Sequence, residues 1–307
     1  MGGMRARTLI TVAAAGGAAA FGYASVIERN WFALREVTVP GALPEGARPL
    51  RLLHISDLHL TPGRHRLMSF VRTLDSLEPD LVVNTGDTIA SHQAVGHLID
   101  ALGPLLQRPG AWVYGSNDLF SPKPKNPLLY LWRTSALDHD RDVPDLPWER
   151  LGEEMTAAGW LDLNNGRGRL KAGEIDIALA GVHDSHTAKA RYDLVAGPAD
   201  ASADLRIAVM HSPEPRIMDQ FVADGYELLL AGHTHGGQVR VPGFGALATN
   251  CGIDRGRVSG LSMHPQVASP DGKTAWLHVS AGLGTSPWAP VRFGCRPEAT
   301  VLTLLPR

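Results

Sequence analysis

Five short polar clusters each follow an apolar run of the chain, and they contain many side chains of the kinds that bind metal ions. In chain order the clusters are Ser56-Asp57-Leu58-His59, Asn84-Thr85-Gly86-Asp87, Gly115-Ser116-Asn117-Asp118, His211-Ser212-Pro213 and Gly232-His233-Thr234-His235. Imidazole nitrogens with carboxylate and amide oxygens, and without a thiolate, suit manganese, iron or zinc. The clusters therefore predict a metal centre assembled from separate segments of the chain.

The spacing inside these clusters supports that prediction. Asp57 and His59 are two residues apart, as are His233 and His235. On an extended backbone, residues i and i+2 point the same way, so each pair can hold one cation. Asp87 follows a glycine, where the backbone can approach an ion closely. The set is large enough for two divalent ions, which at about 4 Å separation can activate water and hold both oxygens of a displacement at phosphorus.

The order DLH, GD, GSND, H and GHTH resembles the calcineurin-like metallophosphoesterase superfamily, whose pattern is DxH, GD, GNH(D/E), H and GHxH. The match spans about Leu50 to Leu305. The segments 207–213 and 231–238 are similar to a bacterial branch with membrane-linked phosphodiesterases and lipid-sugar pyrophosphatases. The resemblance implies a four-layer α/β/β/α sandwich, with a two-metal site at one edge of the two sheets.

The resemblance also implies a role for each motif residue. Two divalent ions, of manganese, iron or zinc, would be held by Asp57, His59 and His235, by Asn117, His211 and His233, and by Asp87 as the bridge between them. The implied reaction is hydrolysis of a phosphodiester or pyrophosphate bond by attack of a metal-bridging hydroxide. The implied substrate is lipid-linked or a nucleotide.

The third motif departs from the family pattern. If Ser116 is an insertion, Asn117 keeps the ligand role and Asp118 takes the place of the histidine near the leaving group. Without an insertion, Ser116 falls on the ligand position and Asn117 on the histidine. An amide oxygen is the better neutral donor to a hard cation, which favours Asn117 as the ligand. In both readings the usual histidine is absent, and this favours substrates with an acidic leaving group.

Further candidates follow the apolar run 175–180. His183 and Arg191 are predicted to meet a substrate phosphate, and His186 to donate a proton in place of the missing histidine. A polar loop with satisfied hydrogen bonds explains the same residues equally well. Arg292 is a further candidate for holding a dianion, and His54, inside the first apolar run, is interpreted as a core histidine.

The clusters must be positioned by the elements before them. Strands are predicted from Leu50 to Ile55, Asp80 to Asn84, Ala111 to Tyr114, Ile175 to Ala180, Leu205 to Met210, Glu227 to Ala231, Ala275 to Val279 and Thr300 to Leu305. Helices are predicted from Arg66 to Leu77, Ala94 to Leu106, Trp148 to Ala158 and Arg216 to Ala223. Strands that alternate with helices indicate an α/β fold, which places its site at the strand ends.

The segment 121–145 is predicted to be a surface excursion, because it contains four prolines around the apolar group Leu128-Leu129-Tyr130-Leu131-Trp132. The apolar group either touches lipid or a lipid-like substrate, or it tucks under the domain. The sequence leaves both open.

The first residues indicate targeting. Arg5 and Arg7 precede an uncharged, Ala- and Gly-rich stretch from Thr8 to Ile27, near the length that spans a bilayer. We predict a signal peptide or membrane anchor over residues 1–27, a lead-in segment over 28–49 and the phosphoesterase domain over 50–307. The protein would then be anchored or secreted, membrane-associated, and at the cell envelope facing outward. The alternative is an Ala-rich helix packed on the domain.

Composition sets outer limits on function. The chain has 307 residues, 44% of them hydrophobic, and a net charge of −2. This balance excludes a disordered chain and predicts no stable nucleic-acid binding, since the basic excess for that is missing. The two cysteines cannot form a disulfide scaffold. The expected partners are a phosphoester substrate and a membrane surface. The alternatives are a phosphomonoesterase, or a membrane-tethered metal-containing binding protein that has lost turnover.

Overall fold

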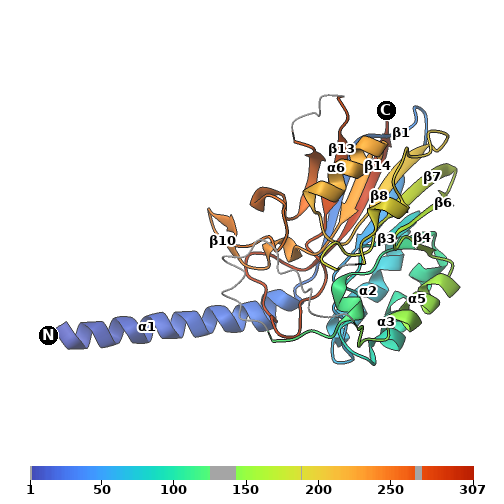
Figure 1. The fold of residues 1–307 in the computed structure, drawn as a ribbon. Helices are drawn as coiled ribbons and strands as arrows, with labels where there is room; N and C mark the ends of the chain where they lie inside the picture. The colour runs from blue at the N-terminus through green and yellow to red at the C-terminus, as the bar shows by residue number, and fades with distance from the viewer. Residues whose placement is uncertain (1, 125–142, 188, 267–271) are drawn as a thin grey trace.

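The apolar runs form two six-stranded sheets in the computed structural model, which describes residues 2–124, 143–187, 189–266 and 272–307 (Figure 1). The strands of the first sheet, in spatial order, are β1 (Ala33–Leu43), β14 (Glu298–Pro306), β2 (Leu50–Ile55), β3 (Leu81–Asn84), β4 (Gly110–Trp112) and β5 (Leu161–Asp162). The strands of the second are β12 (Gly260–His264), β13 (Ala275–Val279), β9 (Leu228–Ala231), β8 (Leu205–Val209), β7 (Ile175–Gly181) and β6 (Gly166–Ala172). All eight predicted strands are present, within two residues at each end.

Alternation along the strands divides the apolar side chains between two faces. In β2, Leu50 and Leu52 belong to the core that the two sheets share, whereas Leu53 and Ile55 belong to the core beneath the helices. In β9, Leu228 and Leu230 likewise face the other sheet. The strands are continuous apolar runs because both of their faces are covered.

Helices cover the outer faces of the sheets. The helices α2 (His65–Thr73), α3 (Ala94–Leu102) and α5 (Trp148–Ala157) contribute Leu67, Leu98 and Leu151 to the core on the first sheet. The helix α6 (Pro215–Asp224) contributes Phe221 to the core on the second sheet. In Figure 1 the first three helices lie together, apart from α6. The predicted α/β class is confirmed.

The direction of the strands brings the polar clusters to one end of the molecule. β2, β3 and β4 run parallel to one another, as do β7, β8 and β9. The loops that follow parallel strands meet at the same edge of a sheet, which is where α/β proteins form their sites.

The four edge strands of the two sheets, β1, β5, β6 and β12, were not predicted from the sequence. The segment 28–49 contains β1, which pairs in parallel with β14 from Ala33 opposite Glu298 to Val39 opposite Leu304. β1 is an edge strand with many exposed residues and includes Pro40 and Gly41, so it lacks the apolar signal of the central strands. A domain boundary at residue 50 therefore leaves out one strand of the sheet.

The N-terminal helix α1 (Gly2–Gly22) projects away from the sheets (Figure 1). Among the helices that the structure describes, none is both long enough and apolar enough to cross a membrane. The base of this segment is fixed to the domain: Arg292 N donates to Ala24 O at 3.0 Å, and Cys295 N donates to the buried carboxylate of Glu28 at 2.6 Å. The apolar group Leu128–Trp132 lies outside the described residues.

Candidate metal centre

Six of the seven predicted metal ligands lie on loops directly after four strands. Asp57 and His59 follow β2, Asp87 follows β3, His211 follows β8, and the pair His233 and His235 follows β9. Asn117 lies in the one-turn helix α4 (Ser116–Leu119), shortly after β4. The parallel ends of both sheets thus bring together residues that are up to 178 positions apart, from 57 to 235.

The first ligand group contains Asp57, His59 and His235. The Nε2 atoms of His59 and His235 are 3.1 Å apart, and His235 Nε2 is 3.6 Å from Asp57 Oδ1. Ligand atoms that bind one ion at about 2.1 Å lie about 3 to 3.5 Å from one another. The group therefore has the dimensions of a metal site.

The second ligand group contains His211 and His233, and Asp87 lies between this group and the first. His211 Nε2 is 3.2 Å from His233 Nδ1. Asp87 Oδ2 is 3.4 Å from both His59 Nε2 and His211 Nε2. This carboxylate oxygen stands between the two groups, in the position of a bridge.

The buried carboxylate of Asp57 tests whether a metal ion fits. Its Oδ2 accepts hydrogen bonds from Ser56 Oγ at 2.5 Å and His233 N at 3.0 Å. Its Oδ1 is buried and has no hydrogen-bond partner. A buried carboxylate oxygen without a partner is costly, and a cation bound at the first group would remove that cost. The donor set therefore fits a divalent ion.

The backbone is strained at the same residues. Asp57, His59, Asp87, His233 and His235 all have positive φ angles, between 43° and 68°. Such angles are uncommon outside glycine and concentrate at functional sites. Glycines make room around them: a Cβ at Gly232 would lie 2.6 Å from Asp57 Oδ2. The strained turns aim five ligand side chains into one small volume.

The electrostatics of the cluster separate its histidines. Burial opposes a charge on His211, but Asp87 and Asp184 raise the pKa of His211 well above the usual histidine value. Burial and the neighbouring His186 and His211 lower the pKa of His233 to about 3. Burial, followed by His59 and Arg292, holds the pKa of His235 well below its usual value. His233 and His235 are therefore neutral, as metal ligands must be.

The family model for calcineurin-like phosphoesterase matches residues 50–237, which are more than half of the chain and include all the ligands above. The chain belongs to the calcineurin-like phosphoesterase family.

Relatives of this phosphoesterase align over nearly its whole length. It is 27% identical to the Bacillus subtilis metallophosphoesterase YkuE, over 92% of this chain and 89% of that protein. It is 25% identical to the Escherichia coli phosphodiesterase YaeI, over 97% of this chain and 96% of that protein. A Bos taurus transmembrane protein with a metallophosphoesterase domain is 30% identical over 89% of this chain and 57% of its own length. Membership of this family makes the protein a metal-dependent phosphoric ester hydrolase.

Asn117 contacts the bridging carboxylate of the phosphoesterase site. Its backbone N donates to Asp87 Oδ1 at 2.8 Å, and its Nδ2 donates to Asp87 Oδ2 at 2.7 Å. A side-chain amide nitrogen has no lone pair for a metal. In this orientation Asn117 positions Asp87, and a ligand role would require the amide oxygen in place of the nitrogen.

The substitution Asn117→Ala separates these two roles. We expect both metal ions to remain bound and the turnover to fall about 10-fold to 100-fold, because the variant loses one hydrogen bond to Asp87 and keeps the other. Metal content by mass spectrometry and turnover of an aryl phosphodiester provide the two measurements. Loss of one ion would instead establish Asn117 as a ligand.

Asp118 is placed differently from the leaving-group role proposed for it. Its Oδ1 accepts hydrogen bonds from Thr88 N at 2.7 Å and Ile89 N at 3.0 Å, and its Oδ2 accepts one from Gly115 N at 2.9 Å. Burial and the charge of Asp87 raise its pKa to about 7. The side chain is fully buried, ties the second and third motifs together, and does not line the pocket. It therefore does not stand where a leaving-group acid would be needed.

The three candidate residues after β7, His183, His186 and Arg191, lie in different surroundings. His186 lines the pocket, and its ring stacks on that of His233 at 4.3 Å. His183 is buried against the Tyr114 ring, and Arg191 is exposed and pairs with Asp193 at 2.6 Å; neither lines the pocket. The substrate contacts predicted for His183 and Arg191 have no support in this geometry, because both side chains point elsewhere.

Two residues have contacts at the site that the sequence did not predict. Asp184 is fully buried, accepts a hydrogen bond from Ser116 N at 2.9 Å, and was passed over between two histidines. Arg292 is also buried, donates to His235 O at 2.9 Å, and supports this ligand from behind rather than facing a substrate. Ser116 and His235, the partners in these two hydrogen bonds, are 68 and 57 residues away in the sequence.

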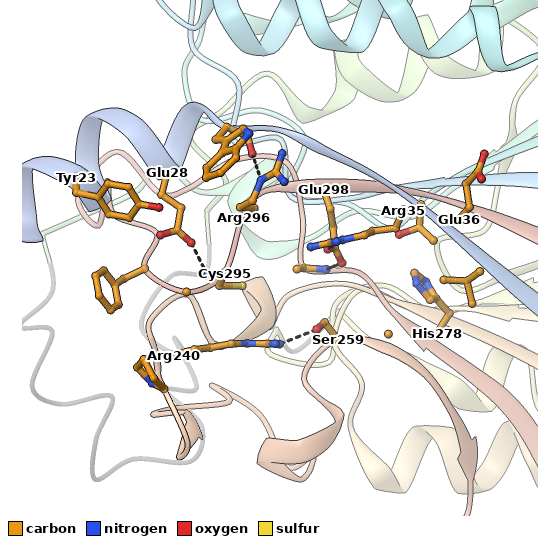
Figure 2. Close-up of a pocket in the computed structure, with 18 residues that line it drawn as sticks. Tyr23, Glu28, Arg35, Glu36, Arg240, Ser259, His278, Cys295, Arg296 and Glu298 are labelled. Carbon is orange, nitrogen blue, oxygen red and sulfur yellow. Dashed lines mark hydrogen bonds and ion pairs between the residues drawn. The ribbon is translucent and has the colours of Figure 1, made fainter.

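Two cavities lie near this end of the phosphoesterase. One, of about 330 Å³, contains the side chains of His59, Asp87, Asn117, His186, His233 and His235. The other, of about 620 Å³, lies between the N-terminal segment and the open edges of the two sheets (Figure 2). Figure 2 shows Arg35 beside Glu298 and Glu28 beside Cys295 in this cavity, which contains none of the predicted ligands. The chemistry therefore belongs to the smaller cavity.

Proposed function

We propose that this phosphoesterase is a two-metal enzyme that hydrolyses a phosphodiester or pyrophosphate bond. The observation that supports the proposal is the position of Asp87 Oδ2, 3.4 Å from a histidine of each ligand group. One carboxylate oxygen so placed can be shared by two ions. Manganese, iron and zinc all suit the nitrogen and oxygen ligands.

The residues divide as follows. Asp57, His59 and His235 would hold the first ion, His211 and His233 would hold the second, and Asp87 would be shared by the two. When bound, the two ions supply an activated water and neutralise charge on the phosphoryl oxygens. Asn117 keeps Asp87 in place through two hydrogen bonds. His186, in the pocket wall, gives a proton to the departing oxygen.

The pocket favours a diester over a monoester. Among the residues described around it, Lys123 is the one lysine or arginine. A phosphomonoester is a dianion and calls for more positive groups, as in the arginine clamps that recognise phosphate. The apolar part of the pocket lining includes Phe120, Leu247 and Trp288. This part of the wall suits an apolar or aromatic group next to the phosphorus, as in a lipid-linked or nucleotide substrate.

Trp288 is the residue with which to test this wall. It is 57% exposed at the pocket mouth, and its Nε1 donates to Pro122 O at 2.9 Å. We expect Trp288→Ala to raise KM for an aryl or acyl-chain phosphodiester about 10-fold, through about 1.4 kcal/mol of lost contact, with little change in kcat. KM for dimethyl phosphate, which has no large apolar group, is the matched comparison and is expected to stay the same.

The proposed activity is tested with the purified full-length chain. Hydrolysis of an aryl phosphodiester and of its monoester is measured after metal removal and after addition of manganese or zinc. We expect metal-dependent turnover with the diester preferred. Preference for the monoester would favour a phosphomonoesterase, and metal binding without turnover on either ester would favour a binding protein.

The finer features of fold and location belong to the same proposal. The helices on the outer faces of two facing sheets support the four-layer α/β/β/α arrangement. The uncharged stretch from Thr8 to Ile27 and a bovine relative named as transmembrane support association with the cell envelope, anchored or exported. Fractionation of cells that express the full chain tests the location: recovery wholly in the soluble cytoplasmic fraction would contradict it.

A further inference from the structure

Asp184 is a fully buried carboxylate that the proposed reaction does not assign to either metal ion. Its Oδ2 accepts a hydrogen bond from Ser116 N at 2.9 Å; its Oδ1 accepts one from His186 N at 3.0 Å and lies 3.3 Å from His186 Nδ1. A carboxylate has about four acceptor positions, so one on Oδ2 is left over. None of the described contacts of Asp184 is with a lysine or arginine. A buried negative charge of this kind needs a cation close by.

Asp184 lies beside the second ligand group. Ligand atoms of Asp184, His186 and His233 lie within 4.8 Å of one another. Burial lowers the pKa of His211, but the charges of Asp87 and then Asp184 raise it, so the Asp184 carboxylate is near His211 as well. Asp184 lies on the loop after β7.

Of the two side chains in that cluster, the geometry selects the carboxylate. The rings of His186 and His233 are nearly parallel, with 19° between their planes and 4.3 Å between their centres. The Nδ1 of His186 lies 3.3 Å from Asp184 Oδ1, so this nitrogen faces the carboxylate. His186 also has its Nε2 directed at Glu214 Oε1, 3.4 Å away. Asp184 is therefore the member with an oxygen free for the second ion.

The third motif explains why an additional ligand is needed. Read without an insertion, it places Ser116 where the family pattern has a ligand asparagine. Asn117, the next residue, has its amide nitrogen on Asp87. The backbone N of Ser116 donates to Asp184, so this carboxylate lies next to the residue at that position. We propose that Asp184 is a ligand of the second metal ion and replaces the missing asparagine.

This inference rests on the proposed function and refines its substrate class. Two divalent ions bring four positive charges, of which Asp57 and Asp87 neutralise two. Asp184 neutralises a third, whereas an asparagine would leave it. A site with less positive charge holds a dianionic monoester less well and loses less with a monoanionic diester. The replacement therefore makes the enzyme selective for diesters.

The test compares the metal binding of the full-length wild type with that of Asp184→Asn. Manganese is titrated calorimetrically into the metal-free proteins, and bound metal is counted by mass spectrometry. We expect two ions in the wild type, and in the variant an unchanged first ion with at least a 10-fold weaker second ion. The matched control is Glu214→Gln, which removes the other carboxylate at His186 and is expected to keep both ions.

Unchanged affinity for both ions in a folded Asp184→Asn variant would overturn the inference, even if its pH–rate profile shifts, because Asp184 would then act through His186. A wild type that binds fewer than two ions would overturn the proposed function instead. If Asp184→Asn does not fold, Asp184→Cys with cobalt provides a direct readout. A thiolate-to-cobalt absorption band, missing from the wild type and from Glu214→Cys, is expected; a second bound cobalt without that band would contradict ligation.

Discussion

Asp87→Asn is expected to abolish metal-dependent phosphodiester hydrolysis, with a loss of at least about 1,000-fold in kcat/KM, or about 4 kcal/mol. The substitution preserves the size of the side chain but removes the charge that stands between the two ligand groups. Asp87 Oδ2 contacts a histidine of each group at 3.4 Å, so no neighbouring residue can take over its role. Initial rates at saturating manganese, with metal content measured on the same samples, check this prediction.

Two variants outside the pocket serve as controls for Asp87→Asn. Asp193→Asn removes an exposed carboxylate that pairs with Arg191 outside the pocket, and Arg191→Ala removes its partner. Both are expected to keep wild-type kcat and KM within about twofold, because an exposed ion pair contributes little. A 10-fold rise in KM for Arg191→Ala would restore Arg191 as a substrate contact. Full activity in Asp87→Asn would exclude the two-metal reaction proposed here.

A second large effect is expected in the dependence of stability on pH. His54 and His278 face one another between the two sheets, with their Nδ1 atoms 2.8 Å apart, and His54 Nε2 is 3.0 Å from Thr85 Oγ1. Burial lowers the pKa of His278 to about 3. Burial and the neighbouring His278 hold the pKa of His54 well below the usual value. Both rings are therefore neutral in the folded protein.

The sign of the effect follows from proton binding. Below pH 6.5, His54 and His278 each bind a proton in the unfolded chain but stay neutral in the folded chain. Acid therefore favours unfolding. Stability is fully present above pH 6.5 and falls as the pH drops toward 3. Each of the two histidines is expected to lower the free energy of unfolding by about 2 kcal/mol between pH 6.5 and pH 5. Urea unfolding of the metal-free protein at these two pH values measures the loss.

His278→Asn isolates this contribution. Asparagine places an amide near the position of Nδ1, so it can keep the hydrogen bond to His54 without titrating. The other buried histidines titrate equally in both proteins and cancel in the comparison. The variant is expected to lose about 2 kcal/mol less than the wild type between pH 6.5 and pH 5. Equal losses of stability would show that His278 is not the titrating group. His278, Glu298 and Arg35 all line the large cavity (Figure 2).

The interior strands and the candidate ligands after them could be read from the sequence because their signals are local. A buried parallel strand is a continuous apolar run. Two such runs are Leu50–Ile55 and Leu205–Val209, and candidate ligands follow each of them directly. The edge strand β1 was missed because half of its surface meets solvent, and an exposed edge tolerates charged residues and proline. Burial, which creates the apolar signal, is weak there.

The sequence by itself determined the family, the order of the central strands along the chain and six candidate ligands, since each depends on short motifs and short spacings. The tertiary structure alone decided which side chains meet. In the folded protein Arg191 pairs with Asp193, and both oxygens of Asp118 accept hydrogen bonds from backbone N–H groups. Asp184 contacts Ser116, which is 68 residues away in the sequence. Contacts of this kind depend on the register and packing of two sheets, and no local spacing encodes them.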